Sequence, residues 1–155
     1  MEASLESRLF RAAALTFEEL AFMFTDPELN PRQLAAPFAA AGAIDFRGPF
    51  RGRIVVRLFG DLLPTLTANM LGETQGDDPA LQEDSLKEIA NVICGNLLPL
   101  VAGDTAVFNL EPPCFHAHPV GPPAGLRHKG SVSLGLEAGR AEVELFTDQP
   151  DGEEC

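Results

Sequence analysis

Two long stretches of the sequence have the residue spacing of helices, and the last third of the chain changes to the spacing of strands. The spacing in residues 5–24 predicts one long helix, and residues 79–99 form the second. One face of the first helix carries Leu9, Ala13, Thr16, Leu20 and Phe24. Beyond Gly103, apolar residues recur at every second position, which is the period of a strand with one buried face. We therefore predict an α+β fold in which two long helices pack on a mainly antiparallel β-sheet.

Shorter patterns predict the remaining elements. These are a β-hairpin formed by 43–47 and 50–59 around Gly48-Pro49, a short helix at 61–71 followed by Gly72, and strands near 107–108, 132–136 and 143–146. The segment 112–130 contains five prolines and three glycines, which favours loop and edge strand over a central strand.

Length and charge restrict the classes of partner. A chain of 155 residues is long enough for one domain with its own core, so we predict a single domain at 1–148 and an acidic tail at 149–155. The 23 Asp and Glu residues outnumber the 11 Lys and Arg residues, and the net charge of −12 repels phosphate backbones and anionic lipids. We therefore expect neither nucleic acid nor a membrane as a partner.

Cysteine usage and hydropathy predict a cytoplasmic location. The three cysteines are an odd, scattered set, which indicates reduced thiols rather than a disulfide framework. The first residues lack the pattern of a secretory signal, and no apolar run reaches the roughly 18 residues of a membrane span.

One face of the second long helix carries a stripe of polar residues and a glycine. At about 100° per residue, Asp84, Glu88, Asn91 and Gly95 fall close together, opposite the apolar face. A solvated surface is the commoner explanation of such a stripe. Asparagine is a mediocre helix former, however, and glycine costs up to about 1 kcal/mol in a helix interior, so this stripe also suits close docking by another surface.

The segment EDSLKEIANVICGN resembles the signature helix of the CheC/CheX/FliY family of chemotaxis phosphatases. The family pattern is Asp or Ser, three residues, Glu, two residues and Asn, commonly followed by Gly-Asn. Asp84, Glu88, Asn91 and Gly95-Asn96 match it position by position. The order of predicted elements agrees as well, and the resemblance implies a pseudo-twofold assembly of these elements.

The first helix contains a weak copy of the same motif. Aligning Glu19 with Glu88 keeps the glutamate and the apolar phase but puts Phe22 at the position of Asn91. A single complete copy resembles the CheX-like branch, whose members tend to dimerise, so a homodimer is expected. The alternative is an ordinary amphipathic helix with Phe22 in its core.

The resemblance implies a phosphatase that hydrolyses the aspartyl phosphate of a CheY-like response regulator, in chemotaxis or related two-component signalling. It assigns Asn91 to orienting the attacking water and Glu88 to pairing with a cation on the receiver domain, its active-site lysine. Asp84 and Gly95 would contact the partner, and the alternative for Asp84 is a charge on the helix face with no partner. No cofactor is expected on this chain, because Mg²⁺ is supplied by the phosphorylated receiver domain.

Other assignments compete with these. Cys114, His116 and His118 alternate and could supply zinc ligands, but no fourth ligand stands at a recognisable spacing, so we expect ordinary edge residues and no metal site. Cys94 lies between the core and polar sides of its helix and is expected to be a semi-buried apolar residue rather than a nucleophile. The main rival function is a CheX-like domain that binds a receiver or another signalling protein without catalysis.

Overall fold

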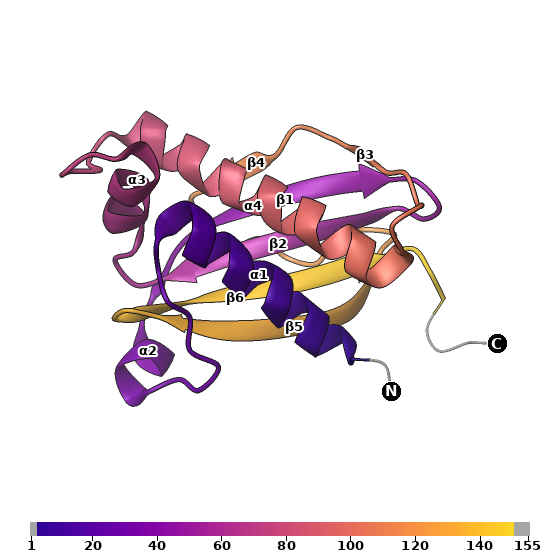
Figure 1. Ribbon diagram of the computed structural model, residues 1–155, viewed down its shortest axis with the longest axis horizontal. Helices are drawn as coiled ribbons and strands as arrows, with labels where there is room; N and C mark the ends of the chain where they lie inside the picture. The colour runs from indigo at the N-terminus through magenta and orange to yellow at the C-terminus, as the bar shows by residue number, and fades with distance from the viewer. Residues whose placement is uncertain (1–2, 151–155) are drawn as a thin grey trace.

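A six-stranded antiparallel sheet carries two long helices on one face in the computed structural model, which describes residues 3–150 (Figure 1). The elements in chain order are α1 (Leu5–Ala21), α2 (Pro31–Ala35), β1 (Phe38–Arg47), β2 (Gly52–Phe59), α3 (Leu63–Leu71), α4 (Pro79–Ala102), β3 (Asn109–Leu110), β4 (Cys114–His116), β5 (Arg127–Leu136) and β6 (Gly139–Thr147). The predicted α+β fold is confirmed. The predicted tail lies mostly at 151–155, outside the described residues.

The sheet is built from two hairpins that meet at its centre. The strand order is β3-β1-β2-β6-β5, and β4 also pairs with β1. At the central junction β2 runs antiparallel to β6, with Gly52 opposite Thr147 and Val56 opposite Val143. A long helix precedes each hairpin, α1 before β1-β2 and α4 before β5-β6, and each helix packs on the hairpin of the other half. This is the pseudo-twofold arrangement that the resemblance implies.

The core lies between the helices and one face of the sheet. Strand alternation turns Ile44 and Ile54 toward the helices, where both are buried. The predicted apolar face of α4 is buried completely, as Ile89 and Ile93 show with no exposed area. Burying each such side chain contributes about 1.5–3 kcal/mol to folding, so this face fixes the rotation of α4 and leaves the opposite face outward.

The end of α1 differs from the prediction. The helix ends at Ala21 instead of residue 24, and Phe22 has a left-handed backbone with a φ of 54°. Phe22 and Phe24 are 71% and 90% exposed, so their predicted place on the core face was wrong. The chain turns here because Met23 enters the core and because Asp26 pairs with Gly135 beside the sheet. Left-handed backbone costs a non-glycine residue on the order of 1 kcal/mol.

The other helices follow their predicted signals with small differences. α3 has Pro64 in its first turn and ends at Gly72, whose φ of 69° suits glycine. α4 begins at Pro79 as predicted, but it continues past Pro99 to Ala102. α2 was not predicted, although Asn30 and Gln33 form a capping box at its start. Among residues 3–150, no helix combines the length and the apolar character needed to cross a membrane.

The strands of the two hairpins agree with the prediction, but the strand predicted near 107–108 was wrong: Val107 is 78% exposed, and the short edge strand β3 lies two residues later, at Asn109–Leu110. β1 and β2 form the predicted antiparallel hairpin, although β1 begins at Phe38 rather than near Ala43. β5 and β6 form the second hairpin, with a turn at Glu137 and Ala138. The proline-rich segment supplies the short edge strand β4 and the loop that follows it, as its composition predicts.

Candidate functional site

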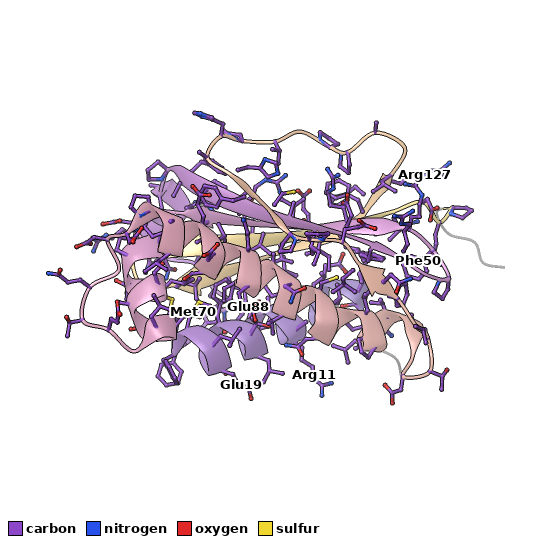
Figure 2. All side chains as sticks on the ribbon, turned by 90° about the horizontal axis from the view of Figure 1, so that it is seen from above. Arg11, Glu19, Phe50, Met70, Glu88 and Arg127 are labelled. Atoms are coloured by element: carbon purple, nitrogen blue, oxygen red, sulfur yellow. The ribbon has the colours of Figure 1, made fainter. Side chains whose placement is uncertain are left out.

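The exposed face of α4 carries the four predicted residues on consecutive turns. Asp84, Glu88 and Gly95 are exposed and Asn91 is partly buried. Figure 2 labels Glu88 on α4, Met70 on α3 and Glu19 on α1, three helices that pack against one another. The helix thus brings the three polar side chains and the bare glycine together in one row.

The start of α4 is capped by the residues that precede it. The side chain of Asp78 accepts a hydrogen bond from the backbone N–H of Ala80 at 2.9 Å. Gln82 donates to the carbonyl of Gly76 at 2.6 Å, which ties the first turn of α4 to the loop after α3. These contacts hold the N-terminal half of α4, and therefore the polar stripe, in register with the core.

The asparagines on the helices differ in the hydrogen bonds that their carboxamides form. Asn96 donates to the hydroxyl of Thr16 at 3.0 Å and links α4 to α1. Asn69 donates to the carbonyl of Ala21 at 2.7 Å and links α3 to the end of α1. Within residues 3–150, by contrast, neither the Asn91 carboxamide nor the Glu88 carboxylate has a hydrogen bond or an ion pair. Both groups are therefore available to another molecule.

Gly95 leaves a bare stretch of backbone one turn beyond Asn91. A Cβ atom added at Gly95 would meet no neighbouring atom within 4 Å outside the local backbone. Packing within the chain therefore does not require glycine at this position. A close approach by a partner surface would require it.

The equivalent part of α1 keeps the core residues and the glutamate of the motif but loses its asparagine. Three aligned pairs are buried in both helices: Thr16 with Ser85, Phe17 with Leu86, and Ala21 with Ala90. On the outer face, Glu19 is exposed like Glu88, but the position of Asn91 falls on Phe22, beyond the end of the helix. The second copy alone therefore presents a carboxylate and a carboxamide together.

Cys94 is buried completely rather than partly, which corrects the predicted semi-buried position. Burial raises the pKa of its thiol to about 12. The reactive thiolate is therefore scarce at neutral pH, in agreement with the prediction that Cys94 is an apolar packing residue.

The Cys114, His116 and His118 motif does not converge on one point. Cys114 and His116 belong to the short strand β4, which pairs with β1, and His118 lies after that strand has ended. Within the part of the chain that the structure describes, no group of three or more His, Cys, Asp or Glu side chains is placed to hold a metal ion.

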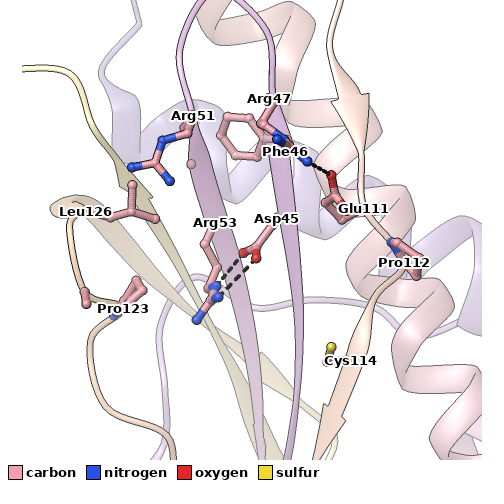
Figure 3. Close-up of a pocket in the computed structure, with 12 residues that line it drawn as sticks. Asp45, Phe46, Arg47, Arg51, Arg53, Glu111, Pro112, Cys114, Pro123 and Leu126 are labelled. Atoms are coloured by element: carbon pink, nitrogen blue, oxygen red, sulfur yellow. Dashed lines mark hydrogen bonds and ion pairs between the residues drawn. The ribbon is translucent and has the colours of Figure 1, made fainter.

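A pocket lies on the opposite face of the sheet from α4. It has a volume of about 790 Å³ and is lined by three arginines, with Figure 3 showing Arg53 against Asp45 and Arg47 against Glu111. Arg47 and Glu111 are 2.7 Å apart. The hydrogen bond to Asp45 raises the pKa of Arg53, which stays cationic. Because these guanidinium groups are already paired with carboxylates, the pocket offers no unpaired charge to a ligand, and we place the functional site on α4.

Comparison with known proteins gives one family and a set of similar structures. The family model described as chemotaxis phosphatase CheX matches residues 40–120, which include the whole polar stripe. A comparison with curated protein sequences gave no match.

Three of the similar structures are crystal structures from bacteria. Chemotaxis protein CheX from Vibrio vulnificus is 18% identical, with a TM-score of 0.74 over 94% of this chain and 97% of that chain. Chemotaxis protein CheX from Desulfovibrio desulfuricans is 15% identical, with a TM-score of 0.75 over 92% and 98%. The CheX-CheY-BeF3-Mg²⁺ complex from Borrelia burgdorferi matches at 17% identity, with a TM-score of 0.65 over 94% and 99%. At these identities the matches show a shared fold.

Proposed function

The chain belongs to the CheX family of chemotaxis phosphatases, and we propose that it hydrolyses the aspartyl phosphate of a CheY-like response regulator. The observation that carries this proposal is the pair of unused groups on α4, the Asn91 carboxamide and the Glu88 carboxylate. The Borrelia complex supports the class of partner, because it joins a protein of the same fold to CheY.

Asn91 is proposed to hold the attacking water in line with the phosphorus atom. Phosphoryl transfer depends mostly on positioning and on compensating charge. A carboxamide can accept and donate hydrogen bonds to a water without placing a negative charge beside the phosphoryl group. A carboxylate at this position would repel that group, which explains why Glu88 belongs one turn away.

Glu88 is proposed to bind a cation of the receiver domain, its active-site lysine. Its exposed carboxylate has no ion-pair partner within residues 3–150, so it can form the pair without losing an existing one. Asp84, one turn closer to the start of α4, would contact the rim of the partner, and Gly95 would allow its backbone to approach.

The proposed reaction forms one bond to phosphorus and breaks another. The water oxygen forms a bond to phosphorus as the bond between phosphorus and the aspartate oxygen breaks. The aspartate leaves as a carboxylate, and the water protons end on inorganic phosphate and solvent. Mg²⁺ on the receiver domain compensates the charge of the phosphoryl oxygens, so the chain itself contributes positioning.

The cellular setting follows from the same proposal. A phosphatase for a response regulator acts in the cytoplasm, in chemotaxis or a related two-component pathway. A homodimer is proposed from the branch that the single complete motif resembles.

The test measures the lifetime of the phosphoryl group on a receiver domain. Purified protein is incubated with phosphorylated CheY-like receiver domains and Mg²⁺. We expect the wild type to shorten the phosphoryl half-life, Asn91→Ala to lose this activity while still binding, and Glu88→Ala to lose activity and affinity. Asn109→Ala and Glu28→Ala are matched controls, because both remove exposed side chains of the same types outside α4. A wild type that leaves every half-life unchanged would overturn the proposal and favour a binding domain without catalysis.

A further inference from the structure

Apolar side chains are exposed where α1 and α3 end beside each other. Phe22 is 71% exposed and Leu71 is 44% exposed, and Met70, which precedes Leu71 in α3, is partly buried. The hydrogen bond from Asn69 to the carbonyl of Ala21 joins the two helix ends, so Phe22 and the pair Met70-Leu71 belong to one surface. We call these three residues the helix-end patch.

The conformation of Phe22 is unfavourable for the isolated chain. Its backbone is left-handed, at the helix-end position where glycine is the common residue, and its ring is left in water. Neither the backbone nor burial within the chain accounts for a phenylalanine here. Strained residues that persist tend to cluster at functional sites.

The helix-end patch continues into the proposed catalytic surface. α3 packs against both α1 and α4, so Met70 of α3 and Glu88 of α4 belong to neighbouring helices of the layer that Figure 2 shows from above. Around these residues the surface is acidic, with exposed Glu19 on α1, Glu73 after α3 and Asp84 on α4. A surface that fits this area has an apolar centre flanked by lysine or arginine side chains.

We propose that Phe22, Met70 and Leu71 form the apolar anchor on which the receiver domain docks while its phosphoryl group faces Asn91. The occupant is the receiver domain itself, through an apolar surface with a cationic rim. This inference rests on the proposed function and adds the place that holds the partner. It also gives the degenerate copy on α1 a role, because Phe22 stands where the second carboxamide would be.

The experiment separates docking from hydrolysis. CheY-like receiver domains loaded with beryllofluoride and Mg²⁺ are titrated with wild type, Phe22→Gly and Leu71→Ala, and turnover is measured separately at saturating phosphorylated receiver. We expect Phe22→Gly to weaken binding at least tenfold and Leu71→Ala to weaken it several-fold, with turnover at saturation unchanged. Leu34→Ala, which truncates an exposed leucine on α2, is the matched control.

Phe22→Gly suits this test because glycine accepts the left-handed backbone, so its melting temperature should equal or exceed that of the wild type. Wild-type affinity in both variants would overturn the docking proposal and leave the phosphatase intact. Binding that depends on Phe22 without any hydrolysis would support docking and overturn the proposed function. Docking would also be overturned by a wild type that binds no receiver domain. The same holds if the patch variants change only the oligomeric mass measured by sedimentation.

Discussion

α1 and α4 occupy equivalent places in the two halves of the molecule, yet only α4 carries the complete motif. Both helices bury aligned core residues, and each packs on the hairpin of the other half. They differ at the position of Asn91, because α4 continues for three more turns whereas α1 ends at Ala21. The comparison teaches that two helices can keep the same buried core residues while only one of them keeps the carboxamide of the motif. The difference here involves the backbone as well as the side chain.

The largest effect is expected when the two helices exchange the residues at this position. Asn91→Phe should reduce phosphatase activity at least about 100-fold, because no carboxamide remains to position the water. The double variant Asn91→Phe with Phe22→Asn should stay as inactive, because residue 22 lies outside the helix. Phosphoryl half-life measures both, and melting curves check that the variants fold. Recovery of activity in the double variant would mean that a side chain alone separates the copies.

The next largest effect is expected at the aligned core positions that are buried in both helices. Ala21→Leu and Ala90→Leu should each lower the free energy of unfolding by about 1–3 kcal/mol, because neither position has any exposed area to receive a larger side chain. Urea unfolding measures this change, and Ala35→Leu on the exposed side of α2 is the control. If only one of the two core variants is destabilised, the packing of the halves is less alike than their aligned burial suggests.

A smaller effect is expected from Cys94, in the part of α4 that has no helical counterpart in α1. Burial raises the pKa of its thiol from 9.0 to about 12, so the folded state favours the neutral thiol. The contribution of the neutral Cys94 thiol to the free energy of unfolding is complete below about pH 9, and it is lost as the pH rises toward about 12. Between pH 7 and pH 10, the free energy of unfolding should fall by about 1 kcal/mol more in the wild type than in Cys94→Ala. Equal losses in the two proteins would contradict this.

The smallest effect is expected at Gly95. Gly95→Ala should raise the free energy of unfolding by about 0.5–1 kcal/mol, because the helix gains a better residue and the new Cβ meets no neighbour. The same variant should lower phosphatase activity a few-fold by hindering the partner. Gly72→Ala is the contrasting control, since the φ of 69° at Gly72 makes alanine unfavourable there. Unchanged activity in Gly95→Ala would remove Gly95 from the proposed interface.

Periodicity in the sequence was enough to predict the three longer helices, the hairpins and the stripe on α4, because these features depend on local spacing and on which face is buried. The five-residue helix α2 is too short to show such a period. The end of α1 could not be predicted in this way. It depends on the pairing of Asp26 with Gly135 in β5, a contact between residues far apart in the chain. The apolar spacing of residues 5–24 continues past that point and gives no sign of the turn.

The candidate site also combines features that follow from local spacing with features that depend on contacts between distant parts of the chain. The positions of Asp84, Glu88, Asn91 and Gly95 on one face follow from helical geometry. The difference between Asn91 and Asn96 does not, because it depends on whether Thr16 of another helix lies within reach of the carboxamide. Nor does the sequence separate Met70 from the core leucines, since its partial exposure depends on how α3 packs against α1 and α4.

Pro99 inside α4 has a consequence for recognition through the main chain. Proline has no N–H, so the carbonyl of Gly95 lacks the donor that the fourth following residue of a helix normally supplies. An acceptor is thus open to solvent on the turn after Asn91, at a residue with no side chain to shield it. Alanine variants of Asp84, Glu88 and Asn91 would not detect a partner that donates to this carbonyl. Pro99→Ala would, because it returns the missing N–H and closes the acceptor within the helix.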